Sequence, residues 1–370
     1  MTTQTSDLTL RHCIQKVATG PEYSKDLNFE EARSAMRQIL DDSVDPVQAG
    51  VFLIALRMKR ETQDENKGAL QAIRETMEIV TAPVDTVLDM ADPYDGFLRN
   101  LPMSPFLPAV LASCKIPTFS HGIELVGPKY GVTHAKILRA AGINTDKTTT
   151  EAAQSLADVG WAYVDQSRFC PLLYQLESLR SRIVKRPLLT TIEVLASPIR
   201  GKKSTHYVTG YVHKAYPPVY LDLARFLSFD SAVVVKGNEG GIIPSLKQES
   251  RLFEYHGDGE IQLRELDPAS CGLKQSVRAV PLPDDLPPAT VESDDIGASL
   301  DIDSMAEAAA EVGIKTLQGE KGVALDSLIY GGAIILSHLH KQLSLREAAE
   351  TIAERISSGE AYAYFKAALN

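Results

Sequence analysis

The sequence predicts an α/β protein in which a small, all-helical N-terminal domain stands beside a larger domain with a mostly parallel central sheet flanked by helices. Two observations predict this fold class. The first 80 or so residues place apolar side chains at helical spacing, whereas short apolar runs alternate with helical segments from Val84 onward. Strands that alternate with helices are typical of a parallel sheet covered on both faces. We therefore expect a helical domain over residues 1–82, joined by a helical insertion near residues 171–200, and an α/β domain over residues 83–370.

Three helices are expected in the N-terminal domain from their start signals. Asn28 followed by Glu31 forms a capping box, in which each side chain accepts a hydrogen bond from the other residue's backbone amide. Asp45 is a typical N-cap before Pro46, and Thr62 opens a second capping box. The wide apolar faces behind these starts favour a surface through which two copies of the chain form a homodimer.

The α/β domain is expected from short apolar runs and the helical segments between them. Residues 280–303, with four prolines and seven acids, indicate a loop or linker, and two helical stretches, 326–339 and 344–357, end the chain. The expected strands are 87–90, 116–119, 161–164 and 232–235, and the expected helices between them are 105–113, 135–141 and 221–227.

Composition excludes several classes of protein. Residues 1–8 are polar and lack the basic start and apolar stretch of a signal peptide. No apolar run reaches the roughly 18 residues that a membrane span needs. The four cysteines are far apart, which argues against a zinc site and a disulfide framework. We therefore expect a cytoplasmic protein without a membrane partner or a protein-bound metal.

Charge is unevenly distributed along the chain. The net charge of −10 opposes nonspecific attraction to nucleic acid, yet residues 180–214 carry eight cations against the single anion Glu193. This basic stretch has two interpretations. It is either a solvated basic face or a site for a polyanion, which is a phosphorylated substrate or a nucleic-acid backbone.

Two short motifs are candidate ligand contacts. His121-Gly122 follows an expected strand, and open α/β sheets bind ligands at the carboxyl ends of their strands. The glycine-rich run 237–241 also follows an expected strand, where backbone amides of a turn can bind an anion. For each motif the alternative is an ordinary structural role.

Several segments, taken in order, resemble the anthranilate phosphoribosyltransferase family, which has the nucleoside-phosphorylase-like phosphoribosyltransferase fold. The resemblance runs from about residue 8 to residue 368, and the combined order is more specific than any one piece. The matching segments are 48–59 (QAGVFLIALRMK), 120–122 (SHG), 160–161 (GW), 208–211 (VTGY) and 344–361, together with Arg180 and Arg186.

The resemblance implies a site for phosphoribosyl pyrophosphate and an acceptor. Asp95-Gly96 and His121-Gly122 should open onto one edge of the sheet, with Lys129 and Arg180 completing a cleft of positive potential. The substrate-binding residues carried over are Asp95, Gly96, Asn100, Ser104, His121, Gly122, Lys129 and Arg180, and the further anion-binding candidates are Arg186, Lys202 and Lys203.

The chain departs from the family at the motifs that bind diphosphate. The family's Gly-Thr-Gly-Gly-Asp loop is replaced by residues 91–95 (ADPYD), where Pro93 removes an amide donor and Asp92 adds a negative charge beside a diphosphate. The family's acidic metal pair is replaced by Ile242 and Ile243, so no cofactor is certain and magnesium is expected only through the substrate's diphosphate.

Two functions follow as hypotheses. One is a glycosyl or phosphoribosyl transferase that acts on a small phosphorylated substrate, with weak or absent activity in the family's step of tryptophan biosynthesis. The other is a non-catalytic homologue that binds single-stranded nucleic acid. The first is favoured by the full-length resemblance, and the second by the altered motifs and the basic stretch.

Overall fold

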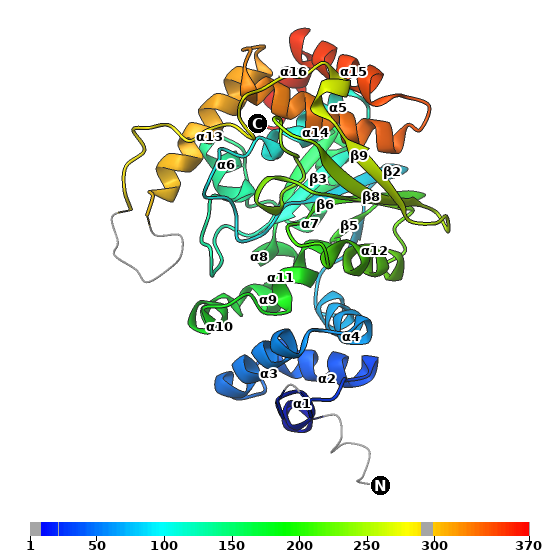
Figure 1. Cartoon of the computed structure of the whole chain (residues 1–370), viewed down its shortest axis with the longest axis vertical. Coiled ribbons are helices and arrows are strands. Elements are labelled where there is room, and N and C mark those ends of the chain that lie inside the picture. The colour runs from blue at the N-terminus through cyan, green and yellow to red at the C-terminus, as the bar shows by residue number, and fades with distance from the viewer. Residues whose placement is uncertain (1–8, 21, 290–298, 370) are drawn as a thin grey trace.

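The computed structural model describes residues 9–20, 22–289 and 299–369. Its main sheet, within these residues, has seven strands in the order β4-β3-β2-β6-β7-β8-β9 (Figure 1). The first five strands in this order are parallel, and β8 and β9 add an antiparallel hairpin at one edge. The predicted fold class is therefore confirmed. The strands are β2 (Thr86–Ala91), β3 (Thr118–Gly122), β4 (Trp161–Asp165), β6 (Ser204–Gly210), β7 (Ser231–Val235), β8 (Ser250–His256) and β9 (Gln262–Leu266).

The N-terminal domain is helical, as its start signals predict. Both N-terminal capping boxes are present, and the side chain of Asp45 caps the helix that begins at Pro46. A later helical segment returns to this domain, because Gly50 faces the side chains of Leu179 and Ile183. Figure 1 shows that segment beside the N-terminal helices. The helices are α1 (Leu10–Val17), α2 (Phe29–Leu40), α3 (Pro46–Lys59), α4 (Gln63–Arg74), α9 (Pro171–Tyr174) and α10 (Glu177–Ile183). The domain boundary at residue 82 stays a prediction.

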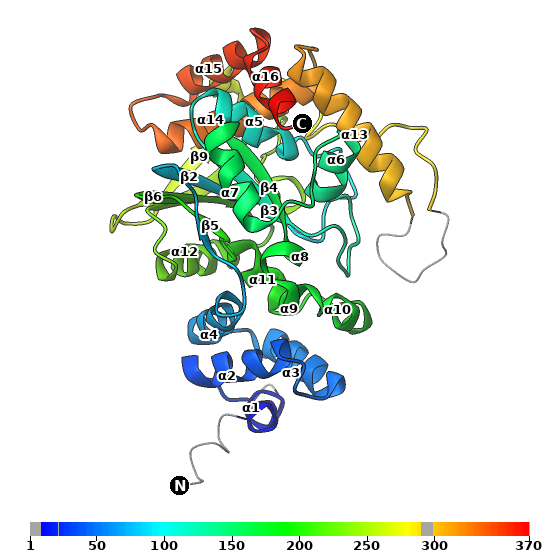
Figure 2. The ribbon, with the colours of Figure 1, turned by 180° about the vertical axis from the view of Figure 1, so that it is seen from behind.

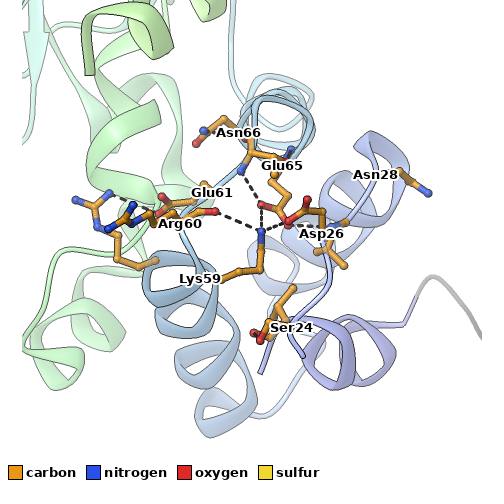
Figure 3. A network of polar contacts seen from close by, with 12 residues as sticks. Ser24, Asp26, Asn28, Lys59, Arg60, Glu61, Glu65 and Asn66 are labelled. Atoms are coloured by element: carbon orange, nitrogen blue, oxygen red, sulfur yellow. Dashed lines mark hydrogen bonds and ion pairs between the residues drawn. The ribbon is translucent and has the colours of Figure 1, made fainter. Parts of the chain in front are cut away.

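Lys59, at the end of α3, holds the helical domain together through buried charge (Figure 3). Its ammonium lies 3.0 Å from the carboxylate of Glu65 and 2.5 Å from that of Asp26. Glu65 is fully buried and also accepts the backbone amides of Leu27 and Thr62 at 2.9 and 2.8 Å. Two ion pairs of Lys59 thus join the end of α3 to the start of α4 and to the segment before α2.

The two faces of the sheet pack into two separate cores. Val87 and Ala91 of β2 face a core shared with the helical domain, whereas Leu88 and Met90 face a core shared with the C-terminal helices. Figure 2 shows those C-terminal helices at the end of the molecule opposite the helical domain. The remaining helices are α5 (Leu107–Ser113), α6 (His134–Ala140), α7 (Thr149–Asp158), α8 (Gln166–Phe169), α11 (Leu189–Ile192), α12 (Tyr216–Phe226), α13 (Ile302–Leu317), α14 (Val323–Leu339), α15 (Leu345–Ser357) and α16 (Glu360–Ala367).

Several expected boundaries are wrong. The strand expected at 116–119 begins at Thr118 and runs on to Gly122, and the hairpin of β8 and β9 was not expected. The expected linker 280–303 lies partly outside the described residues, and its end is wrong because α13 begins at Ile302 with Asp301 as its cap. Two short strands, β1 (Val80–Thr81) and β5 (Ile199–Arg200), pair separately. Of the helices described, none has the length and apolar character to cross a membrane.

Candidate functional site

A cleft of about 500 Å³ lies between the helical domain and the carboxyl ends of strands β2 and β6. Open α/β sheets place ligand sites at these strand ends because the loops there are free to vary. Three parts of the chain contribute much of the wall. Helix α3 contributes Ile54, Arg57 and Met58, and helix α12 contributes Tyr216 and Tyr220. The third part is the segment 184–194, which includes α11.

The cleft offers aromatic rings and cations together. The guanidinium of Arg57 lies 5.4 Å from the ring centre of Tyr216. The ring centres of Tyr216 and Tyr220 are 5.8 Å apart. Burial raises the pKa of Tyr220, so this phenol stays neutral at physiological pH. Arg57, Lys185 and Arg186 stand against the acids Asp95 and Glu239 in the lining, which leaves a small excess of positive charge. A flat anionic ligand suits such a surface, because arginine binds carboxylate and phosphate groups while aromatic rings stack on planar groups.

Asp95 and Arg186 form an ion pair at the cleft. The guanidinium of Arg186 donates to one carboxylate oxygen of Asp95 from Nη2 at 2.6 Å and from Nε at 2.8 Å. Asp95 is buried, whereas 47% of the Arg186 side chain is exposed. Gly96 follows with a φ of +76°, and a Cβ there would lie 2.5 Å from the carbonyl oxygen of Val132. Asp95 and Arg186 therefore line the cleft, as predicted, whereas Gly96 packs against the backbone of residues 131–132 and does not line it.

Glu239, which the sequence analysis missed, gathers four groups of donors. Its carboxylate accepts the backbone amide of Arg99 at 2.7 Å and that of Leu98 at 3.2 Å. It also accepts the side-chain amide of Asn100 at 2.9 Å and the ammonium of Lys129 at 2.7 Å. Asn100 and Lys129 were both predicted as substrate contacts. They lie together, but an acid of the chain itself engages them.

A second carboxylate, that of Asp92, is buried and also accepts several donors. One oxygen accepts the backbone amide of Ile242 at 2.9 Å. The other is hydrogen-bonded to the hydroxyl of Ser104 and, at 2.9 Å, to Nε2 of His134. Ser104 was predicted to contact substrate. Because it is only 2% exposed, it lies inside the protein rather than on the cleft wall.

His121 lies in the interior of the sheet. Its Nε2 is 2.9 Å from a carboxylate oxygen of Asp89, and its Nδ1 is hydrogen-bonded to the hydroxyl of Tyr94. The side chains of His121 and Asp89 are fully buried. Burial also raises the pKa of Tyr94. His121-Gly122 does end β3 at the same edge of the sheet as the end of β2, as predicted, because the two strands are parallel. Neither residue lines the cleft, however, so their predicted contact with substrate there is wrong.

The basic stretch does not form one face. Arg180 is 1% exposed and forms a two-bond ion pair with Glu193, so its predicted place in the cleft is wrong. Lys202 and Lys203 precede β6 and bind the carbonyl oxygen of Pro83 and the carboxylate of Asp85. Since β2 and β6 are parallel, these lysines lie at the edge opposite Asp95. Their predicted role in the same anion site is therefore contradicted by geometry.

The residues at the family's metal position do not fit a magnesium ion. Ile242 is 2% exposed and its side chain has no oxygen to offer the ion. The nearby carboxylate of Asp92 already accepts three protein donors. Over the residues that the structure describes, no three His, Cys, Asp or Glu side chains gather as a metal site. Magnesium carried by a substrate diphosphate stays a prediction.

Residues missed at the site had weak signals in the sequence. Glu239 lies in the glycine-rich run 237–241 that was proposed to bind an anion through its amides, and its own carboxylate was overlooked. Asp92 was predicted only as a charge unfavourable to diphosphate. Tyr216 and Tyr220 are four residues apart and so share one face of α12, a spacing that sequence alone does not distinguish from core packing.

Comparisons with known proteins agree with this arrangement. Residues 11–77 match the helical bundle domain of a glycosyl transferase family. The anthranilate phosphoribosyltransferase of Thermus thermophilus superposes with a TM-score of 0.73 over 97% of this chain and 98% of that one, at 20% identity, which shows a shared fold. An uncharacterised protein of Aquifex aeolicus is 30% identical over 72% of this chain and 79% of its own length. The anthranilate phosphoribosyltransferase of Novosphingobium aromaticivorans is 30% identical over 69% of this chain and 76% of its own length. The chain belongs to the anthranilate phosphoribosyltransferase family.

Proposed function

We propose that this protein is a phosphoribosyltransferase-like protein that binds a phosphorylated or otherwise anionic ligand with a planar ring in its cleft. We propose also that its transfer of a phosphoribosyl group to anthranilate is weak or absent. The cleft supports the first part, because Arg57, Lys185 and Arg186 line it together with the rings of Tyr216 and Tyr220. The second part is supported by Asp92, a carboxylate of the protein itself that engages hydrogen-bond donors at the altered diphosphate motif.

One observation carries the second part of the proposal. Asp92 stands in the segment that replaces the family's glycine-rich loop, and its carboxylate holds the amide of Ile242, the hydroxyl of Ser104 and the ring of His134. These donors are therefore not free for a diphosphate. A charge-assisted hydrogen bond is worth roughly 1.5–3 kcal/mol, so losing two or three lowers the stabilisation of a leaving diphosphate by several kcal/mol.

The test is a fluorescence assay of anthranilate consumption with phosphoribosyl pyrophosphate and magnesium. The Novosphingobium aromaticivorans relative, assayed in parallel, provides the positive control. We expect kcat/KM at least about 10³-fold below that of the relative, because each 1.4 kcal/mol lost is a factor of ten. Activity within ten-fold of the relative would overturn the proposal.

Binding of single-stranded nucleic acid is the alternative function. It was motivated by the altered diphosphate and metal motifs and by the basic stretch 180–214, and the opposite positions of Arg186 and Lys202 weaken only the last of these supports. The two ligand classes separate by salt. Affinity for single-stranded DNA that rests on several phosphate contacts falls by orders of magnitude between about 50 and 200 mM salt, whereas a small phosphorylated ligand depends on salt much less.

A homodimer through the N-terminal helices is part of the proposal. Val47, Val51 and Met58 of α3 are 73%, 44% and 78% exposed, which is unusual for apolar side chains clustered on one helix. Covering them by a second copy is favourable because it removes apolar surface from water. Sedimentation at micromolar concentration tests this expectation, and a clean monomer would contradict it.

A further inference from the structure

We propose that Glu239 is a specificity-determining residue that keeps a diphosphate group out of the loop 96–100. In this proposal its carboxylate occupies the place of a phosphoryl group, and the loop binds inorganic pyrophosphate once that carboxylate is removed. The inference deepens the proposed function, since it takes the same cleft as the ligand site and names the residue that excludes one class of ligand.

The donors around Glu239 form an anion site. Two consecutive backbone amides, of Leu98 and Arg99, point to the same carboxylate, which is the arrangement by which turns bind phosphate. The amide of Asn100 and the ammonium of Lys129 complete the set at 2.9 and 2.7 Å. Lys129 also donates to the carbonyl oxygen of Gly96 at 2.5 Å, which fixes the ammonium against the loop.

The backbone at Glu239 has a strained conformation, and in this conformation its carboxylate reaches the donors of loop 96–100. Its φ is +51°, a left-handed value that costs a residue with a side chain on the order of 1 kcal/mol or more. The turn is held from behind by Asn238, whose amide donates to the carbonyl oxygens of Ile243, Pro244 and Arg278. Such strain persists where surrounding contacts outweigh it, and the donors of loop 96–100 supply those contacts.

The position of Glu239 lets an external anion compete for the same donors. Glu239 lines the cleft beside Asp95 and Arg186, and its side chain is 10% exposed. A diphosphate that entered with Glu239 in place would meet a like charge and find Lys129 already neutralised. Removal of the carboxylate reverses both effects, because it leaves the ammonium of Lys129 and the amides of Leu98 and Arg99 without the acceptor that they share.

The test is a calorimetric titration of inorganic pyrophosphate, without magnesium, into the wild-type protein and into Glu239→Ala. We expect pyrophosphate to bind Glu239→Ala at least about ten-fold more tightly, the change that follows from freeing one charge-assisted contact. Glu239→Gln keeps the size of the side chain but removes its charge, so a smaller gain in the same direction is expected. This variant carries the test if Glu239→Ala does not fold.

Two controls separate the site from a general change of charge. Glu249→Ala removes one negative charge from an exposed position in the following loop, and we expect no gain. Lys129→Ala in the Glu239→Ala background should abolish the gain. Equal binding by the wild type and Glu239→Ala, or an equal gain in Glu249→Ala, would overturn the inference. The titration involves no acceptor and no turnover, so its outcome is independent of the anthranilate assay.

Discussion

The guanidinium of Arg180 and the carboxylate of Glu193 form a two-bond ion pair inside the protein, with N–O distances of 2.6 and 2.7 Å. The two side chains are 1% and 0% exposed. Burial on its own lowers the pKa of Arg180, but the carboxylate of Glu193 outweighs burial and raises it, so the guanidinium stays charged. The pair joins α10, which packs on the helical domain, to the segment that follows α11.

Replacing Arg180 with methionine is therefore expected to destabilise the protein rather than to abolish ligand binding directly. Glu193 would be left as a buried, uncompensated charge, which costs about 3–5 kcal/mol. The free energy of unfolding from urea denaturation measures this loss. The double variant Arg180→Met/Glu193→Leu should recover most of it, because an apolar pair of similar volume replaces the ion pair. A single variant as stable as the wild type would contradict the expectation.

The free energy of unfolding is expected to fall as the pH falls from about 6.5 to 4. Burial lowers the pKa of His206 from 6.5 to about 4, with His338 and His256 adding to the shift and Asp230 opposing it. The unfolded chain therefore binds a proton in this range that the folded protein does not. His206 alone removes about 2 kcal/mol between pH 7.5 and pH 5 by this linkage. Burial lowers the pKa of His338 too, which acts in the same direction.

Urea denaturation at pH 7.5 and pH 5 checks this dependence. His206→Asn should flatten it, because asparagine does not titrate, whereas His213→Asn changes an exposed histidine and should leave the pH dependence as it is. A wild-type stability that is equal at the two pH values, or rises on acidification, would refute the assignment.

Local signals predicted the fold well because they act within one turn of chain. Asn28 caps α2 and Thr62 caps α4, both as the sequence indicates, since a capping box depends only on residues three apart. The hairpin of β8 and β9 was missed although Gly257-Asp258-Gly259 between them is a turn signal, because β9 is mostly exposed and has little apolar alternation. Half-polar edge strands carry less periodicity than buried ones.

The candidate site was predicted in part, since its contacts join distant segments. Asp95 and Lys129 were identified from the resemblance, but Glu239 reaches Arg99 across 140 positions of sequence. A count of charges over residues 180–214 likewise treats Glu193 as one anion among eight cations, whereas in the fold its carboxylate forms an ion pair with Arg180 alone among those cations. Pairing of this kind is decided by tertiary packing, and no local pattern reports it.

Arg186 is expected to contribute to binding of an anion, whereas Lys202 is not. Arg186→Gln should weaken the binding of inorganic phosphate about ten-fold, because it removes a charge-assisted donor and leaves the charge of Asp95 facing the cleft. Lys202→Ala and Lys203→Ala alter the opposite edge of the sheet and should change the affinity less than about two-fold, as expected for distant exposed charges. Calorimetric titration of the three variants measures these affinities, and an equal loss of affinity in all three would contradict the assignment of the site.

Lys59 is expected to be essential to the stability of the helical domain. Lys59→Met removes the cation that compensates Glu65, and Glu65 is fully buried with its second oxygen held by the amide of Leu27. Leaving that carboxylate uncompensated costs about 3–5 kcal/mol. Urea denaturation followed by circular dichroism measures the loss. Lys315→Met is the matched control, because Lys315 pairs with Glu311 on an exposed face of α13 and such pairs contribute roughly 0–1 kcal/mol.

A second variant shows whether charge or packing causes the loss. Glu65→Gln in the Lys59→Met background removes the buried charge, while the amide oxygen of glutamine can still accept from the backbone of Thr62 or of Leu27. The double variant should therefore be more stable than Lys59→Met alone by on the order of 1–2 kcal/mol, the size of coupling that residues in one ion-pair network show. If the double variant is less stable than Lys59→Met, the aliphatic stem of Lys59 and the shape of Glu65 stabilise the domain, and the electrostatic account of this network is wrong.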